Sequence, residues 1–351
     1  MTTTKSIALI AITMGDAAGI GPETIAMLYQ HHPQTMHHCF VVGDVGIMRR
    51  AAEVVARVCN TPAIPVAEIF DLDAVSALPP RCIGVLPIAA PMQLVPWGEV
   101  NAEAGAMAGR CVEWAADAAL HHKIAAMVTA PLNKASLHAA GMPYAQFPGH
   151  TELLQHQAAR FLQRSIADVP VRMMLANDEL RTVLVSIHVS LRQALEAVTL
   201  DNVLETIAIT HQALTPLLGR APRIAVAGLN PHAGEDGLFG REEIDIIAPA
   251  IAAARLRGAE VAGPFPPDTV FMRARSHPDE IEVVIAMYHD QGLIPVKYLG
   301  VEKGVNVTLG LPLIRTSPDH GTAFDIAGTA QADASSLLEA LRVARKLAGV
   351  A

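Results

Sequence analysis

Short apolar runs that alternate with longer amphipathic segments constrain the fold of this chain most strongly. The segment EIEVVIAM, residues 280–287, ends in a continuous rather than alternating apolar run, which is typical of a strand buried on both faces of a parallel sheet. Similar runs predict strands at residues 7–13, 39–43, 83–88, 124–129, 171–175, 182–188, 223–228 and 282–288. Amphipathic segments predict helices at residues 23–29, 47–58, 102–121, 151–162, 191–198, 203–217, 242–256 and 335–347. This alternation predicts an α/β fold.

The bulk properties exclude several classes of protein. The chain has 351 residues, 51% of them hydrophobic and 17% charged, which is ample for the core of two domains or one large α/β unit. A net charge of −8 without a basic run argues against nucleic acid as the principal partner. No apolar run approaches the roughly 18 to 20 residues that a membrane helix requires. The four cysteines form no CxxC pair, so we expect reduced thiols and a cytoplasmic location.

Three histidines lie just beyond expected strands: His188, His232 and His289. Because ligands of open α/β sheets bind outside the carboxyl ends of the strands, these imidazoles can converge on one pocket. Three imidazoles with an open coordination position suit a catalytic divalent ion, and Asp290 and Glu235 are near enough in sequence to fix the imidazole tautomers. The alternative is that all three are ordinary polar residues that satisfy amides at strand ends.

A fourth histidine and two cations predict a site for a small anion. His150 and Thr151 lie in FPGHTELL, residues 147–154, where Thr151 is expected to cap the next helix and exposed amides to hold a phosphate. Farther along, Arg315 suits a two-bonded clamp on a carboxylate or phosphate, whereas Lys297 is a point charge. In a net acidic chain these cations indicate a small anionic substrate. Simple helix capping and a solvated surface are the alternatives.

The Rossmann dinucleotide fingerprint is absent after the first expected strand. MGDAAGIGPE contains GxG without the full GxGxxG spacing, and no acidic residue stands roughly 20 positions later. DHGTAFDIAGT, residues 319–329, is the other candidate nucleotide loop: its glycines permit close backbone approach, His320 suits stacking on adenine, and Asp325 suits a ribose hydroxyl. The same pattern also fits an ordinary loop that leads into the last helix.

Seven segments spread over nearly the whole chain carry a resemblance to a known family: ITMGDAAGIGPE, VTAPLNKASLHAAG, FPGHTELL, GLNPHAGEDGLFG, GPFPPDTVF, MYHDQGLIPVK and GVNVTLGLPLIRTSPDHGTAFDIAG. Together they resemble the 4-hydroxythreonine-4-phosphate dehydrogenase family of the vitamin B6 pathway, known as PdxA. Its wider superfamily includes isocitrate and isopropylmalate dehydrogenases, whose GDGIGPE and HGSAPDIAG segments are similar to GDAAGIGPE and HGTAFDIAG here. Ala17 replaces a proline common in the family, which loosens a turn but removes no functional side chain.

The resemblance implies a fold of two interleaved α/β lobes with the active site in a cleft and a non-Rossmann NAD site. Residues 1–134 with 293–351 would form the cofactor-binding lobe. Residues 135–292 would form the lobe for metal, substrate and dimerisation.

The resemblance also implies roles for individual residues. A divalent metal (zinc, magnesium or cobalt), at a site shared between the two subunits of a homodimer, would be bound by His188, His232 and His289. Substrate contacts are implied for His150, Thr151, Lys297, Asn306 and Arg315. Catalysis is implied for Asp268 and Lys297. NAD, with NADP left open, would be held by His320, Gly321, Thr322, Ala323 and Asp325.

The implied reaction is oxidation of a secondary alcohol with metal and NAD, followed by decarboxylation of the β-keto acid. The substrate would be 4-hydroxythreonine 4-phosphate or D-threonate or D-erythronate 4-phosphate, and the sequence does not separate them. Within the family, a cis-dihydrodiol dehydrogenase is the alternative. Outside it, the three histidines alone would also suit a metal-dependent hydrolase.

Overall fold

The computed structural model of the chain describes residues 8–300 and 303–350 and divides into two compact units. Unit 1 comprises residues 1–169 and 311–351, and unit 2 comprises residues 170–310. Both ends of the chain therefore belong to the same unit. Among the described residues, no helix combines the length and the apolar character needed to cross a bilayer.

The joins between the units lie at Val169–Pro170 and Gly310–Leu311, whereas the sequence led us to expect them near residues 134 and 293. The first join comes later because α5 (His150–Leu162) packs against α3 (Ala102–Leu120) of unit 1. The second comes later because β11 (Val305–Leu309) pairs with β6 (Arg172–Ala176) of unit 2.

Unit 1 contains a parallel run of strands in the order β3-β4-β2-β1-β5-β12. Their bounds are β1 Ile10–Thr13, β2 Cys39–Val42, β3 Val66–Glu68, β4 Ile83–Leu86, β5 Ala126–Thr129 and β12 Arg315–Pro318. At the centre, Ile10 of β1 is in register with Cys39 of β2 and Ala126 of β5. Every residue of β1, β2, β4 and β5 is buried, as their continuous apolar runs predict.

Side-chain caps begin three helices of unit 1. Asp44, Asn101 and Asn133 each accept a hydrogen bond from a backbone N–H in the first turn, which satisfies one of the otherwise unpaired amides. The helices are α1 Gly21–His31, α2 Val45–Cys59, α3 Ala102–Leu120, α4 Lys134–Ala139, α5 His150–Leu162 and α11 Ser335–Leu347. Helix α3 packs on β1, β2 and β5 and also contacts α4 and α5. Helix α3 thereby supports α5, whose first turn belongs to the candidate site.

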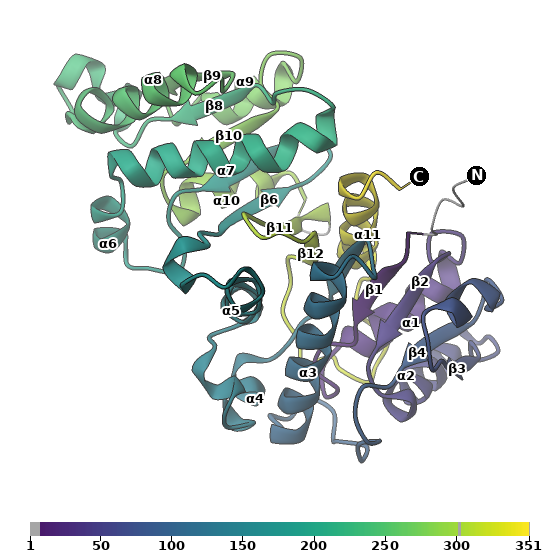
Figure 1. The fold of residues 1–351 in the computed structure, drawn as a ribbon. Coiled ribbons are helices and arrows are strands. Elements are labelled where there is room, and N and C mark those ends of the chain that lie inside the picture. Colours follow the sequence, from purple (N-terminus) through teal and green to yellow (C-terminus); the bar gives the residue numbers. More distant parts are fainter. Residues whose placement is uncertain (1–7, 301–302, 351) are drawn as a thin grey trace, which may run out of the picture. The chain divides into compact units, whose positions relative to one another are not determined.

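Unit 2 contains a mixed run of strands in the order β11-β6-β7-β10-β8-β9. β6 is antiparallel to both β11 and β7, and the remaining pairs are parallel. The bounds not yet given are β7 Arg181–Leu184, β8 Ile224–Ala227, β9 Val261–Phe265 and β10 Val283–Ala286. The helices are α6 Leu191–Glu196, α7 Leu200–Leu218, α8 Ala248–Leu256, α9 Val270–Ser276 and α10 His289–Tyr298. Helix α7 lies on one face of these strands and α10 on the other (Figure 1).

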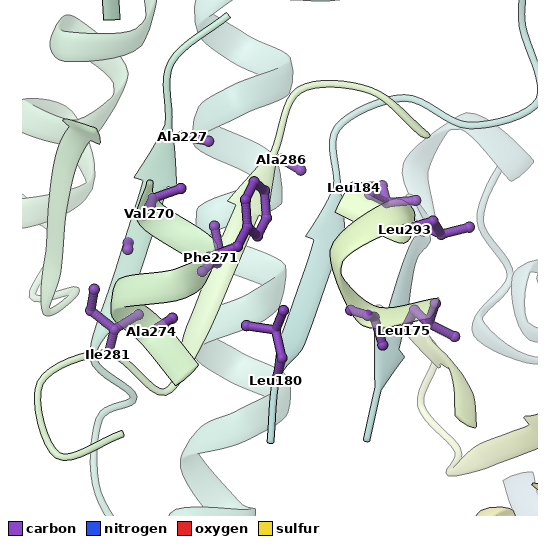
Figure 2. Close-up of a cluster of buried hydrophobic side chains, with 13 residues drawn as sticks. Leu175, Leu180, Leu184, Ala227, Val270, Phe271, Ala274, Ile281, Ala286 and Leu293 are labelled. Atoms are coloured by element: carbon purple, nitrogen blue, oxygen red, sulfur yellow. The ribbon is translucent and has the colours of Figure 1, made fainter. Parts of the chain in front are cut away.

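A buried apolar cluster joins α9 and α10 to the strands of unit 2. Val270 and Phe271 of α9 and Leu293 of α10 point onto the strands in Figure 2, where they meet Leu184 of β7 and Ala286 of β10. This packing fixes the start of α10 at the carboxyl end of β10. The first residue of α10 is His289.

The predicted α/β class is confirmed, and each of the eight predicted strands overlaps one in the structure, although residue 7 lies outside the described residues. Four strands were not predicted: β3, β9, β11 and β12. β9 contains Gly263 and Pro264, and β12 is the polar segment RTSP, so neither has an apolar run. Helices α4, α9 and α10 were also missed. In α10, Gly292 and Pro295 lie inside the helix and are poor helix formers.

Candidate active site

Two of the three expected metal ligands lie together in unit 2. His188 follows β7, and His289 begins α10 directly after β10. Because β7 and β10 pair in parallel, their carboxyl ends share one edge of the sheet. The two imidazole ring centroids are 5.7 Å apart. Both rings border a cavity of about 500 Å³, together with Ser186 and Tyr288.

A carboxylate lies beside one ring nitrogen of His289 and of His232. Nδ1 of His289 is 2.7 Å from Oδ1 of Asp290, and Nδ1 of His232 is 3.2 Å from Oε2 of Glu235. A carboxylate oxygen accepts hydrogen bonds, so both contacts favour the tautomer with hydrogen on Nδ1 and leave the Nε2 lone pair for a ligand. These contacts confirm the two carboxylate neighbours that the sequence predicted.

His232 lies in an unusual left-handed turn. Residues 232–236 all have φ between 44° and 82°, a conformation that is costly for residues other than glycine. Glu243, only 3% exposed, stabilises the approach to this turn, because its Oε1 accepts hydrogen bonds from the backbone N–H groups of Leu229 (2.7 Å) and Asn230 (2.8 Å). Strained backbone held by a buried network is typical of functional sites.

Asp268 and His232 border the same cavity, of about 770 Å³. Asp268 is exposed and lies just before α9. Tyr288 and Asp290 border this cavity as well as the one that contains His188, so the two cavities are neighbours at the same edge of the strands. Asp268 therefore lies in the cavity next to that of His188 and His289.

The donor types near these cavities, imidazoles with neighbouring carboxylates, fit a divalent ion. Within residues 8–300 and 303–350, no three His, Cys, Asp or Glu side chains converge on a point that a metal would occupy. Imidazoles whose second nitrogen is held by a carboxylate are common metal ligands, and His289 and His232 both have this arrangement. One chain thus supplies an adjacent pair, His188 and His289, and a third imidazole at the neighbouring cavity.

In unit 1, a buried cation lies beside a buried imidazole nitrogen. Arg315 begins β12, is 4% exposed, and donates from both Nε and Nη2 to Oγ1 of Thr129, at 3.0 and 2.7 Å. Burial lowers the pKa of the Arg315 guanidinium to about 10. Burial, and then the nearby Arg315, hold the pKa of His150 well below its usual range, and His150 Nε2 has no hydrogen-bond partner. Both features suit an anion.

The expectation that Thr151 caps helix α5 is wrong. The helix begins at His150, Gly149 is its N-cap residue, and no side chain caps it, so Thr151 lies within the first turn. The start predicted from the sequence was one residue too late. Gly149 has no side-chain oxygen, which is the usual sign of an N-cap residue. Without a side-chain cap, the first amides of α5 remain available to an anion.

Lys297 and Asn306 lie away from the histidines in unit 2. Lys297 is half-buried in the last turn of α10, at about 1.5 Å per residue some 12 Å along the axis from His289. Asn306 is half-buried on β11, opposite Leu175 of β6. Neither residue borders the two cavities that contain the histidines.

The predicted cofactor residues form the loop that follows β12 in unit 1. Nδ1 of His320 is 3.1 Å from the carbonyl oxygen of Gly321, which leaves a buried Nε2 without a partner. A Cβ at Gly321 would meet no atom within 4 Å, so the backbone there is open to a ligand. Asp325 is exposed, whereas Thr322 is buried and accepts a hydrogen bond from the Ile20 N–H through its carbonyl oxygen. Ala323 has a positive φ of 39°. The loop thus has an open backbone at Gly321 between the polar side chains of His320 and Asp325.

Sequence reasoning missed Tyr288 and Glu243 as residues of this region. Tyr288 precedes His289 in MYHD, and that adjacency was the signal available for it. Glu243 is 11 positions from His232 in a segment that reads as an ordinary helix. The structure instead has a π-helical turn at Glu243–Ile247, a feature that is frequent at functional sites.

Comparisons with known proteins agree over nearly the whole chain. The family model described as "Pyridoxal phosphate biosynthetic protein PdxA" matches residues 35–344. A 4-hydroxythreonine-4-phosphate dehydrogenase of Beijerinckia indica is 47% identical over 340 residues, which cover 96% of this chain and 94% of that protein. A D-threonate 4-phosphate dehydrogenase of Pectobacterium atrosepticum is 43% identical, with 97% and 99% covered. The crystal structure of 4-hydroxythreonine-4-phosphate dehydrogenase from Klebsiella pneumoniae superposes with a TM-score of 0.84 at 42% identity, covering 97% of this chain and 99% of that one.

Proposed function

Because this chain belongs to the PdxA family of pyridoxal phosphate biosynthetic proteins, we propose that it is an NAD-dependent dehydrogenase of a 4-phosphorylated hydroxy acid. The candidate substrates are 4-hydroxythreonine 4-phosphate, D-threonate 4-phosphate and D-erythronate 4-phosphate, and relatives of this chain are named for the first two. The observation that carries the proposal is the buried Arg315 beside the unpartnered Nε2 of His150, at a helix start without a side-chain cap.

We assign the phosphate to the first turn of α5 and Arg315. The free backbone N–H groups at His150 and Thr151 point out of the helix start, and the helix dipole favours an anion there. Arg315 adds a charge that bulk water barely screens, since it is buried. A bound phosphate would also stabilise the protonated form of His150, which burial otherwise disfavours.

We assign the oxidation to the histidine-lined cavities of unit 2. His188, His232 and His289 would hold a divalent ion, which supplies electrophilic polarisation that lowers the pKa of the substrate alcohol. Asp268, exposed in the cavity that His232 borders, would take the alcohol proton directly or through a water. NAD, held by the loop from His320 to Asp325, would accept the hydride.

Decarboxylation follows when the oxidised product is a β-keto acid. The electron pair of the breaking carbon–carbon bond moves onto the ketone oxygen, and carbon dioxide leaves. We assign Lys297, the half-buried cation in the last turn of α10, to the substrate carboxylate or to protonation of the resulting enolate. Asn306 on β11 would orient the substrate by hydrogen bonding.

We further propose a homodimer in which the metal site is shared. One copy would contribute the adjacent pair His188 and His289, and the other copy would contribute His232. This arrangement is supported by the absence of a three-ligand group among the described residues of one chain and by the separate cavity of His232. A cytoplasmic location is supported by the four cysteines, all of which are free thiols.

An assay at 340 nm with NAD and added zinc or magnesium tests the function. The three phosphorylated candidates are compared side by side in wild type, His289→Ala and His277→Ala. His277 is an exposed histidine at the end of α9 and is the matched control. We expect metal-dependent turnover of one substrate, lost in His289→Ala and retained in His277→Ala.

Other outcomes of the assay would contradict parts of the proposal. Absence of turnover on all three phosphates, with turnover of a cis-dihydrodiol, would remove the phosphate role of His150 and Arg315. Metal-dependent loss of an ester or amide without any change at 340 nm would indicate a hydrolase instead.

A further inference from the structure

Glu23 is a fully buried carboxylate that has no role in the proposed reaction. It lies in α1, within the segment GDAAGIGPE, and is 0% exposed. Its Oε1 accepts a hydrogen bond from the backbone N–H of Gly328 at 3.1 Å, and its Oε2 accepts one from that of Ala330 at 3.0 Å. Both amides belong to the segment that directly follows the candidate cofactor residues His320–Asp325. One carboxylate therefore holds two points of this loop.

A second contact fixes the same loop from another side. The indole of Trp97 packs against Gly328, where a Cβ would lie 2.6 Å from Cδ1 of Trp97 and where φ is +80°, so only glycine fits. The guanidinium carbon of Arg50 lies 3.7 Å from the centroid of the Trp97 ring, which is a cation–π contact. Arg50 also donates to the carbonyl oxygens of Val95 and Ala17, which ties the indole to the start of unit 1.

Thr322, near the start of the loop, is held by the segment that precedes α1. The Ile20 N–H donates to the carbonyl oxygen of Thr322 at 3.1 Å, and the Gly98 N–H donates to that of Ala18 at 2.8 Å. Glu23 and Arg50 also attract each other electrostatically. Burial raises the pKa of Glu23, and the backbone hydrogen bonds from Ala330 and Gly328, followed by Arg50, oppose this increase. Burial lowers the pKa of Arg50, and Glu23 opposes that decrease. The scaffold therefore consists of backbone hydrogen bonds, the buried carboxylate of Glu23 and the half-buried guanidinium of Arg50 on Trp97.

We propose that Glu23 is a positioning residue of the cofactor site, which holds the loop of residues 319–330 in its ligand-ready conformation together with the Arg50–Trp97 pair. The inference rests on the proposed function, because it takes NAD as the ligand of His320–Asp325. A loop that is already ordered does not lose its conformational entropy when the dinucleotide binds, so the cost of binding is smaller. Glu23 would act through the loop and would not contact the cofactor itself.

The test is Glu23→Gln in the full-length protein. Glutamine keeps the shape but offers one acceptor oxygen, so one of the two loop amides meets an NH₂ group. We expect the dissociation constant for NAD, measured by titration calorimetry, to rise by about 10-fold or more. We expect KM for NAD to rise more than kcat falls. In the unliganded protein, hydrogen exchange of residues 326–331 should accelerate by a similar factor.

The matched control is Asp44→Asn. Asp44 is also a buried carboxylate of unit 1, and it accepts from two backbone N–H groups, those of Ile47 and Met92. Among the described residues, its carboxylate makes no hydrogen bond to residues 319–330. This variant should leave the affinity for NAD and the exchange of residues 326–331 as in wild type. Equal weakening of NAD binding in both variants would indicate general destabilisation and overturn the inference.

The remaining outcomes separate the inference from the proposed function. If wild type binds NAD and Glu23→Gln binds it equally well, only the positioning role fails. If wild type does not bind NAD, the proposed cofactor site fails and the inference fails with it. If Glu23→Gln does not fold, Glu23→Asp takes its place, because it keeps the charge beside Arg50 but withdraws the carboxylate from the loop. Unchanged NAD affinity in Glu23→Asp would likewise overturn the inference.

Discussion

Burial determines the charge of His150. Its pKa lies well below the usual value near 6.5, first because the ring is buried and then because Arg315 is close. As the pH falls through about 6.5, the unfolded chain takes up a proton at this residue and the folded chain does not. Folding stability from this group is therefore present above about pH 6.5 and is lost as the pH falls towards the folded pKa.

We expect His150→Asn to remove this pH dependence. In wild type without ligand, His150 should contribute a decrease in the free energy of unfolding of about 1.4 kcal/mol per pH unit below pH 6.5. Urea unfolding of both proteins at pH 7.5 and 5.5 measures the difference in slope. If the free energy of unfolding falls equally in both proteins between pH 7.5 and 5.5, His150 takes up its proton in the folded state as well. Its pKa is then not lowered by burial.

The left-handed turn at residues 232–236 depends on an element that lies outside it. The carboxylate of Glu243, in the π-helical turn before α8, accepts from the backbone N–H groups that lead into the turn. We expect Glu243→Gln to lower the free energy of unfolding by about 1–3 kcal/mol, because glutamine keeps only one acceptor oxygen. Either the Asn230 side chain or the two backbone N–H groups that share Oε1 then lose their acceptor. We also expect zinc affinity to fall by about 10-fold or more, since His232 is then held less firmly.

Glu242→Gln is the control for that prediction. Glu242 also accepts a hydrogen bond from the Asn230 side chain, at 2.7 Å, but no contact of its carboxylate with a backbone N–H is recorded among the described residues. Glu242→Gln should therefore change the zinc affinity little. Equal zinc affinity in wild type and Glu243→Gln, measured by competition with a chelating dye, would show that the turn holds His232 without this carboxylate.

At the scale of the whole molecule, the proposal of a shared metal site predicts complementation between inactive variants. When His232→Ala and His289→Ala proteins are mixed, unfolded and refolded together, half of the dimers are mixed. Each mixed dimer has one site with all three histidines, so about a quarter of wild-type activity should return. Each variant refolded alone should stay inactive. No recovery on mixing would place all three ligands in the same chain.

The sequence alone determined which continuous apolar segments form buried strands, and it placed three histidines after strand ends. Continuous apolar runs such as those of β1 and β10 predicted buried parallel strands, because burial on both faces is written locally in the chain. The carboxylate neighbours of His232 and His289 were predictable for the same reason, since they lie within three positions. Strands β11 and β12 were missed because partly polar segments become strands through their neighbours rather than through their own composition.

Only the tertiary structure decided which distant residues meet. His188 and His289 are adjacent because β7 and β10 are neighbours in the sheet, an order that no local pattern records. Glu23 reaches Gly328 across 305 positions, and no local pattern records this contact either. The start of α5 at His150 depended on backbone geometry at Gly149, not on a capping side chain. Local sequence encodes burial and turns, whereas contacts across the fold depend on strand order and packing, which arise only when the whole chain has folded.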